Sequence, residues 1–435
     1  MNIVISPIKR DWNQIVERPT KGIDDIEPLV LNVFDEVKKG GDRTLLRYTS
    51  VFDKVDIPNL CVSENEIEQA CDLVSVELKS AIDVAKNNIE KFHQAQKSEK
   101  VIVETSKGVS CWQEKRPISE VGLYIPGGTA PLFSTVLMLA IPAKIAGCKE
   151  IIICTPPNSK GAIHPAILYA AQLCGVTKIF KVGGIQAIAG MTMGTKSIPK
   201  VSKIFGPGNQ YVTCAKQVAT KFGVAIDMPA GPSELMVFAD TIANASFVAS
   251  DLLSQAEHGT DSQVILVSTS STFINTVSVE IEKQLKVLPR VDIAREAMSN
   301  SKLIYVKSKE IAIELMNEYA PEHLIICSED EEFFLERIEN AGSVFIGNYT
   351  PESAGDYASG TNHTLPTNGF SKSYSGVNLD SFLKSITFQK ISKEGMQNIG
   401  KSIEIMAEAE GLQAHKNAVS LRLEEINKFN STTSI

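Results

Sequence analysis

The sequence predicts an α/β protein with two incomplete Rossmann-like parallel-sheet domains, a short N-terminal segment and a helical C-terminal tail. From about residue 121, short β-branched runs end at Gly or Pro turns, and an amphipathic stretch follows each run. This alternation of strands and helices is typical of βαβ units, whose strands run parallel. The runs fall into two sets, and 435 residues exceed the size of one ordinary core. We therefore expect two sheets, each with helices on both faces.

The expected strands are short and belong to these two sets. The first set comprises residues 121–125, 150–154, 178–182, 202–205 and 224–227, and the second comprises 234–239, 263–268, 303–306, 323–327 and 343–346. The expected domains are an N-terminal segment (1–21), a first Rossmann-like domain (22–125 and 235–377), a second one (126–234) and a dimerising tail (378–435).

Helical patterns flank the two sets of strands. Before them, residues 64–96 carry apolar side chains at helical spacing, and Ser63 with Glu66 has the spacing of a capping box. After them, residues 393–428 predict helices with a break at Gly411. Such a helical appendage often packs on another subunit, although a solvated tail and docking within its own chain are open alternatives.

Composition and charge exclude several classes of protein. Hydrophobic residues make up 43% of the chain and charged residues 22%, a balance typical of a soluble globular enzyme. The net charge of −8 disfavours nucleic-acid and anionic-membrane partners, because both need a basic surface. Residues 130–147 are the most apolar stretch, but polar residues and a proline interrupt them, so no transmembrane helix is expected.

The eight cysteines form no C-x-x-C pair, which excludes zinc-finger and thioredoxin-type motifs. Residues 1–12 do not have the pattern of a secretory signal. We therefore expect reduced structural thiols and a cytoplasmic location.

One glycine-rich turn resembles part of a dinucleotide fingerprint. Gly206, Gly208 and Asn209 follow an expected strand and open an expected helix, but Tyr211 stands where the fingerprint has its third glycine. Taken alone, this turn fits an ordinary strand–helix connection. No Walker A sequence is present, which disfavours a P-loop ATPase.

Several histidines lie beside other polar residues that can carry chemistry. Gln255 and His258 are three residues apart at the end of an expected helix, so they share a face. They fit a pair of ligands, or a histidine that merely favours the helix dipole. The adjacent Glu322 and His323 precede an apolar strand and offer two proton-transfer groups. They also fit ordinary polar residues at the start of a surface strand.

Two further histidines lie near carboxylates. Asp356 and His363 occur in residues 347–369, a Gly-, Ser-, Thr- and Asn-rich run, and loops of this length are usually functional or disordered. Glu410 and His415 flank Gly411 in the tail. Imidazole and carboxylate together suit Zn²⁺ or a similar metal, although a solvated surface loop is the simpler interpretation of Asp356 and His363 taken alone.

Together, these stretches resemble histidinol dehydrogenases from about residue 20 to the C-terminus. The matching stretches, in family order, are 121–128, 182–187, 204–209, 230–234, 254–258, 321–324, 355–367 and 408–415. The resemblance implies a homodimer with interlocked tails that oxidises L-histidinol to L-histidine through the aldehyde, using two NAD⁺ and a Zn²⁺ at each site.

The resemblance also implies the roles of individual residues. Zn²⁺ would be held by Gln255, His258, Asp356 and His415; the substrate by Ser233, Gln255, His258, His323, Asp356, His363, Glu410 and His415; and NAD by Tyr124, Gln186 and Asn209. Glu322 and His323 would be catalytic. His323 would take the hydroxyl proton in the first oxidation, and Glu322 would activate the water that adds to the aldehyde.

Two rival interpretations remain open. One is another metal-assisted dehydrogenase of polyols or amino alcohols on the same scaffold, which substrate screening would separate. The other is a metal-binding regulatory protein that makes no NADH from histidinol.

Overall fold

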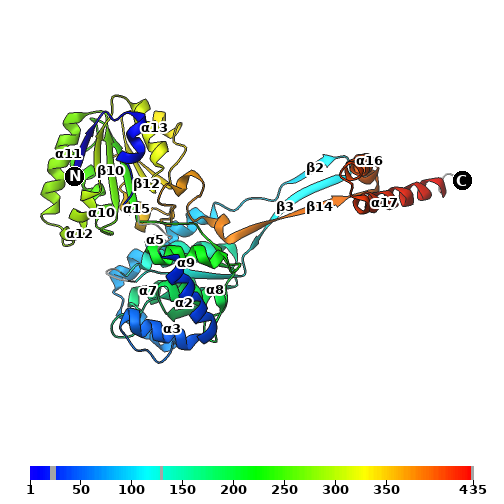
Figure 1. Cartoon of the computed structure of the whole chain (residues 1–435), viewed down its shortest axis with the longest axis horizontal. Helices are drawn as coiled ribbons and strands as arrows, with labels where there is room; N and C mark the ends of the chain where they lie inside the picture. Colours follow the sequence, from blue (N-terminus) through cyan, green and yellow to red (C-terminus); the bar gives the residue numbers. More distant parts are fainter. Residues whose placement is uncertain (20–25, 128–130, 433–435) are drawn as a thin grey trace. The chain divides into compact units, whose positions relative to one another are not determined.

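The computed structural model describes residues 1–19, 26–127 and 131–432, and the chain divides into two compact units. The first unit comprises Met1–Gln96 and Ile118–Phe382, and the second comprises Lys97–Pro117 and Leu383–Ile435. The first unit contains two parallel sheets with helices on both faces (Figure 1), which confirms the predicted α/β fold.

One sheet of the first unit has the strand order β6-β5-β4-β7-β8, and all of its pairings are parallel. Its strands are β4 (Glu120–Tyr124), β5 (Glu150–Thr155), β6 (Lys178–Lys181), β7 (Lys203–Phe205) and β8 (Ala225–Ile226). We call it the first sheet. Numbered along the chain, this order is 3-2-1-4-5, so the direction of progression reverses between β4 and β7. Ligands of such sheets bind beyond the carboxyl ends of the strands at this reversal.

Two apolar cores cover the two faces of the first sheet. Helices α2 (Glu27–Gly40), α8 (Gly184–Met193) and α9 (Gln210–Thr220) pack together on one face, and α4 (Glu64–Leu73), α5 (Val76–Gln94), α6 (Phe133–Ala146) and α7 (Pro165–Cys174) pack on the other. The short helices α3 (Asp42–Tyr48) and η3 (Thr49–Asp53) lie between α2 and α4 along the chain.

The second sheet has the order β1-β11-β10-β9-β12-β13, again all parallel. Its strands are β1 (Asn2–Ile5), β9 (Glu234–Ala239), β10 (Gln263–Ser268), β11 (Lys302–Tyr305), β12 (His323–Cys327) and β13 (Ser343–Ile346). Every residue of β9, β10 and β12 is buried. Burial on both faces explains why these strands are nearly continuous apolar runs in the sequence.

Helices also cover the second sheet on both faces. They are η1 (Lys9–Asp11), α1 (Trp12–Ile15), α10 (Ala245–Ala256), α11 (Ser271–Leu285), α12 (Val291–Ser299), α13 (Lys309–Tyr319), α14 (Glu331–Leu335) and α15 (Glu352–Tyr357). Two short helices, η4 (Phe370–Lys372) and η5 (Leu379–Phe382), follow, and Phe382 stacks on Phe205 with ring centroids 4.1 Å apart.

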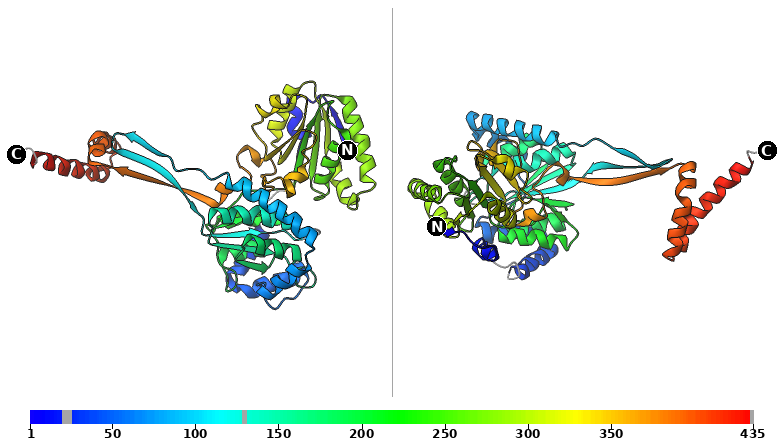
Figure 2. Two further views of the ribbon diagram at one scale, coloured as in Figure 1. Left: turned by 180° about the vertical axis from the view of Figure 1, so that it is seen from behind. Right: turned by 90° about the horizontal axis from the view of Figure 1, so that it is seen from above.

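The second unit is a three-stranded antiparallel sheet followed by two helices. Strand β3 (Val109–Pro117) lies between β2 (Ile102–Ser106) and β14 (Leu383–Ile391), and α16 (Lys393–Ala409) packs on α17 (Gln413–Thr432). In Figure 2 these long strands run side by side, in cyan and orange, and lead to the red helices. Gly411 has a φ of +73°, which confirms the predicted break between the helices.

The observed grouping of elements differs from the expected domain boundaries in three places. Strand β4 and helices α2 to α5 pack with the sheet of residues 126–234, not with that of 235–377. Strand β1 lies in the second sheet, where it pairs with β11. Strand β3 pairs with β2 and with the tail strand β14, so these three strands form a sheet of their own rather than joining either parallel sheet. These pairings join segments far apart in sequence, and local patterns carry no information about them.

Two smaller expectations can also be compared with the structure. The capping box of Ser63 and Glu66 is present, but the expected helix 64–96 is two helices, because Ser75 caps a second one. In the described residues, no helix is long and apolar enough to cross a membrane.

Candidate functional site

Four polar residues meet at the amino edge of the second sheet. His323 is the first residue of β12, and it pairs with Leu235 of β9 and Ser343 of β13. Glu322 comes just before the strand, and its Oε2 accepts a hydrogen bond from the Glu234 N–H at 3.0 Å. Both side chains are buried. The strand register therefore fixes an imidazole and a carboxyl side by side.

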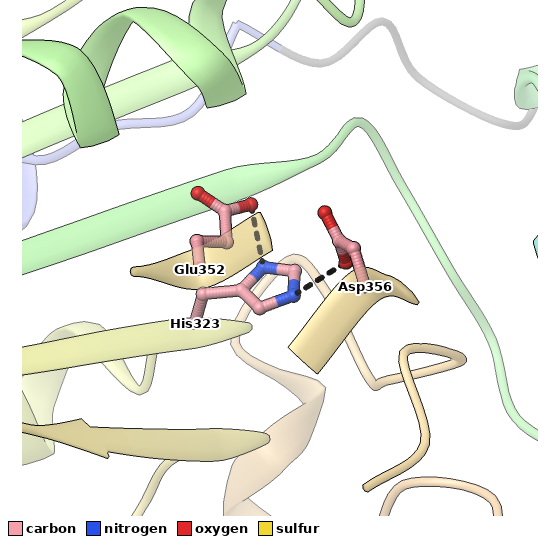
Figure 3. A group of neighbouring side chains, drawn as sticks. All are labelled: His323, Glu352 and Asp356. Carbon is pink, nitrogen blue, oxygen red and sulfur yellow. Dashed lines mark ion pairs between the residues drawn. The ribbon is translucent and has the colours of Figure 1, made fainter. Parts of the chain in front are cut away.

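Helix α15 supplies the other two residues, Glu352 and Asp356. Their carboxylates face His323 from opposite sides of its ring (Figure 3). Glu352 Oε1 lies 3.5 Å from His323 Nδ1, and Asp356 Oδ1 lies 3.8 Å from Nε2. The two carboxylates are four residues apart, so they lie on one face of the helix. His323, Glu352 and Asp356 each offer one ligand atom, and these atoms lie within 4.8 Å of one another, a spacing that can hold a metal ion.

Gln255 and His258 come from the end of α10, which packs against α15. The helix ends at Ala256, so His258 lies beyond it in a turn, and its N–H donates to the Gln255 carbonyl at 3.2 Å. Gln255 is fully buried, and neither atom of its amide makes a hydrogen bond within the described part of the chain. The expected shared helix face is therefore absent, and a backbone hydrogen bond in a turn links the two residues instead.

His363 connects the site to the first sheet. Its Nδ1 lies 3.0 Å from the Asp356 carbonyl, which can only accept, so Nδ1 carries the proton. Its Nε2 therefore accepts from Thr135 Oγ1, at 3.2 Å. Thr135 lies in the first turn of α6, which follows the carboxyl end of β4. This hydrogen bond thus links the site at the amino edge of the second sheet to the carboxyl edge of the first sheet.

Burial governs the pKa values of this cluster. Burial lowers the pKa of His323 to about 3 and that of His363 to about 4, and the neighbouring His258 acts in the same direction. Burial raises the pKa of Asp356 to about 7 and that of Glu322 well above its usual value, to which Glu234 and Asp356 add. Neutral imidazoles can accept protons, and a carboxyl with a raised pKa is a stronger base once ionised.

The unsatisfied polar atoms fit a bound cation. Both carboxylate oxygens of Glu352, both amide atoms of Gln255 and the Nδ1 of His323 are buried and make no hydrogen bond within residues 1–19, 26–127 and 131–432. Buried polar groups normally have partners, so a site with so many unsatisfied atoms suits a ligand. Mixed imidazole and oxygen donors suit Zn²⁺.

The residues expected at a cofactor site gather at the carboxyl edge of the first sheet. Tyr124 ends β4, and its Oη accepts a hydrogen bond from the Gly184 N–H at 3.1 Å. Gln186 lies in the first turn of α8, and Asn209 caps α9 through its Oδ1. These three residues lie at or just beyond the carboxyl ends of β4, β6 and β7, around the reversal of strand order where ligands bind.

The glycine-rich turn between β7 and α9 is held tightly against β4. Gly206 has a φ of +127°, and a Cβ there would lie 2.1 Å from the Tyr124 carbonyl oxygen. Its N–H donates to Asp227 Oδ2 at 2.8 Å, and its carbonyl accepts from Lys216 Nζ at 2.8 Å. Lys216 and Asp227 also form a buried ion pair.

The remaining candidate residues fall in two places. Ser233 precedes β9, at the same sheet edge as Glu322. Glu410 and His415 belong to the second unit, where both are exposed beside Gly411. The structure thus brings Gln255, His258, Glu322, His323, Asp356 and His363 together within the first unit and places Glu410 and His415 in the other.

Sequence reasoning missed Glu352. Residues 347–369 were expected to be loop because they are rich in Gly, Ser, Thr and Asn, whereas Glu352–Tyr357 is a short helix. The four-residue spacing of Glu352 and Asp356 after Pro351 was the available signal, because Pro before an acidic residue is common at helix starts.

Comparisons with known proteins agree with this arrangement. The sequence model of the histidinol dehydrogenase family matches residues 16–423. The chain is 60% identical over 428 residues to the histidinol dehydrogenase of Bacteroides fragilis, covering 98% of this chain and 100% of that protein. It is 58% identical over 423 residues to that of Bacteroides thetaiotaomicron, with coverage of 97% and 99%. The crystal structure of histidinol dehydrogenase from Elizabethkingia anophelis matches with a TM-score of 0.96 and 57% identity, covering 98% of this chain and 99% of that one.

Proposed function

Because the chain belongs to the histidinol dehydrogenase family, we propose that it oxidises L-histidinol to L-histidine through L-histidinaldehyde. The reaction would use two NAD⁺ and a zinc ion at each site, and it would complete histidine biosynthesis in the cytoplasm. The observation that supports this most directly is the buried cluster of Glu322, His323, Glu352 and Asp356 with its unsatisfied polar atoms. The contact between Thr135 and His363 joins this cluster to the edge with the cofactor candidates.

In the first oxidation, His323 would remove the hydroxyl proton of histidinol. Burial lowers the pKa of His323, which keeps its imidazole neutral with a free lone pair but weakens it as a base, so it needs a negative charge nearby when it takes that proton. Bound NAD⁺ supplies the acceptor for the hydride. Glu352 Oε1 lies 3.5 Å from Nδ1 of His323. Burial and the nearby carboxylates raise the pKa of Glu352, whereas the imidazolium that forms would favour its ionised state, and the two charges would then stabilise each other.

The second oxidation needs water, because an aldehyde has no hydroxyl proton to lose. Glu322 would remove a proton from the attacking water, and His323 would accept the second proton. The Glu234 N–H orients the Glu322 carboxylate, because it donates to Oε2. Buried surroundings raise the basicity of this carboxylate once it is ionised.

Zinc would be held by Gln255, His258 and Asp356 of one chain. Bound zinc supplies a Lewis-acidic cation that orients the imidazole and amine nitrogens of the substrate. His323, Glu352 and Asp356 form a second candidate set, because their ligand atoms lie within 4.8 Å. Asp356 is common to both sets.

His415 and Glu410 would complete the site from the partner subunit. Both are exposed in a helical unit separate from the parallel sheets, and the family resemblance implies a homodimer with exchanged tails. His415 would be the fourth zinc ligand. Ser233, His363 and Glu410 would contact the substrate.

A two-step NADH assay with histidinol and with histidinaldehyde, with and without a chelator, tests the proposed function. We expect NADH from both substrates and loss of both reactions after chelation. A chain that makes no NADH from either substrate would support the regulatory-protein interpretation instead.

Elemental analysis of two variants separates the candidate zinc sets. His258→Ala should lose zinc and turnover while keeping its fold, and Glu352→Gln should keep zinc. Zinc retained in full by His258→Ala and lost by Glu352→Gln would favour the set of His323, Glu352 and Asp356.

A further inference from the structure

The first sheet lacks an acidic residue where nucleotide-binding sheets of this order usually have one. In the dinucleotide-binding unit, an Asp or Glu at the end of the second strand accepts hydrogen bonds from the ribose hydroxyls. The second strand here is β5, which ends at Thr155 and continues with Pro156 and Pro157. The Thr155 hydroxyl is buried and makes no hydrogen bond within the described residues. An acid for the ribose must therefore come from elsewhere in the chain.

The segment that contains Asp53 runs past the carboxyl end of the neighbouring strand β6. Val62 N–H donates to the Ile179 carbonyl, and Lys181 N–H donates to the Leu60 carbonyl, at 2.9 and 2.7 Å. This antiparallel pairing means that the residues before Leu60 continue beyond the end of β6.

The same segment also lies against the loop that follows β5. A Cβ on Gly161 would lie 3.0 Å from Ile57 Cγ2 and 3.6 Å from Val55 Cγ2. Asp53 lies two residues before Val55, so these contacts place it near the carboxyl edge of the first sheet, on the side of β5 and β6.

One oxygen of the Asp53 carboxylate has no hydrogen-bond partner among the described residues. This atom, Oδ2, is buried and makes no hydrogen bond within the described part of the chain. The carboxylate lies close enough to Tyr124 for its charge to add to the raised pKa of that phenol. Tyr124 in turn holds the Gly184 N–H at the start of α8. Asp53 thus adds an unsatisfied acceptor to the edge that carries Tyr124, Gln186 and Asn209.

We propose that Asp53 is a further cofactor-binding residue that accepts hydrogen bonds from ribose hydroxyls of the dinucleotide and disfavours a phosphate on that ribose. The inference rests on the proposed function, in which the chain binds NAD. A carboxylate supplied by the helical segment before β4 replaces the acid that β5 lacks. It selects a dinucleotide without the extra phosphate because two anions in buried surroundings repel each other.

Equilibrium binding of NADH and NADPH to the zinc-loaded protein tests this inference, with nucleotide fluorescence as the readout. Asp53→Asn should weaken NADH binding about 10- to 100-fold, the loss expected for a hydrogen bond to a charged acceptor. NADPH binding should weaken less or improve, because the repulsion is removed. Asp56→Asn is the matched control: it removes the same charge three residues away on an exposed side chain and should leave both affinities unchanged.

The melting temperature distinguishes a binding role from a structural one. Because Asp53 Oδ2 lacks a partner in the described residues, removal of its charge should leave the melting temperature unchanged or raise it. Asp53→Ser should behave in the same way. Unchanged NADH affinity in both variants would overturn the inference, as would an equal loss of NADH and NADPH affinity together with a lower melting temperature. A wild-type chain that binds no NADH would contradict the proposed function itself, and with it the role of Asp53.

Discussion

Glu322 and His323 are neighbours in sequence, yet they meet different groups because one precedes strand β12 and the other begins it. The Glu322 carboxylate accepts from the Glu234 N–H, whereas His323 lies between Glu352 and Asp356. This separation supports the different roles that we propose for the two residues.

The first prediction tests that division of roles. Glu322→Gln keeps the shape of the side chain but cannot take a proton from water, so histidinol should still be oxidised to the aldehyde. Oxidation of added aldehyde should slow by about 10²–10⁴-fold, the usual contribution of one general base. His323→Asn should impair both steps. Single-turnover NADH formation from each substrate gives the comparison, and equal slowing of both steps in Glu322→Gln would rule out the division.

The second prediction follows from the raised pKa of Asp53. Burial raises the pKa of this carboxyl from 3.8 to about 6. Between these values the folded state binds more protons than the unfolded state, so this group lowers stability as pH rises through the window. Asp53→Asn should therefore gain stability relative to wild type at pH 7.5 but not at pH 4. Urea unfolding at both pH values measures this, and a pH-independent difference would contradict it.

At the level of elements, the turn between β7 and α9 depends on a buried ion pair. Asp227 accepts from the Gly206 N–H, and Lys216 donates to the Gly206 carbonyl. Both side chains are almost fully buried. The pair therefore fixes the backbone of the turn that positions Asn209.

The third prediction concerns this pair. Lys216→Met leaves the Asp227 charge buried without its partner, which should lower the free energy of unfolding by about 3–5 kcal/mol. Adding Asp227→Asn should recover part of that loss, because no charge is then left unpaired. NADH affinity should fall in both variants as the turn loosens. Denaturant unfolding of Lys216→Met, Asp227→Asn and the double variant measures the free energy of unfolding of each. If the losses of the two single variants add up to that of the double variant, the two residues act independently.

Most elements could be predicted from local patterns. The ten expected parallel strands are all present, because β-branched runs between Gly or Pro turns have few alternative structures. Helix α15 was not predicted, since a Gly- and Ser-rich run resembles a loop, and Glu352 was missed for the same reason. Strands β2, β3 and β14 were missed because solvent covers much of them and their apolar pattern is weak.

At the level of the whole molecule, the two units have different surfaces. The central strands of the second parallel sheet are buried on both faces, whereas the helices of the second unit expose apolar residues such as Ile405, Met406 and Leu421. Exposed apolar side chains on a helical unit fit the proposed exchange of tails between subunits.

The fourth prediction tests that exchange by complementation. In a dimer of one His258→Ala chain and one His415→Ala chain, one site carries both defects and the other carries none if His415 acts on the partner subunit. Random pairing makes about half of the dimers mixed, so co-expression of two inactive proteins should recover about a quarter of wild-type activity. Mixed dimers isolated with two affinity tags and found inactive would place His415 at the site of its own chain.

The sequence by itself determined the parallel α/β architecture, the capping box at Ser63, the break at Gly411 and, through family resemblance, the candidate site residues. These features follow from local periodicity, from turn chemistry or from short motifs shared with the family. Only the tertiary structure decided that His323, Glu352 and Asp356 converge, that His363 contacts Thr135, and that Asp53 lies near enough to Tyr124 to raise the pKa of its phenol. Such contacts join residues that can lie hundreds of positions apart in the sequence. The distances between them are set by strand register and helix packing, and no local preference of the chain encodes these.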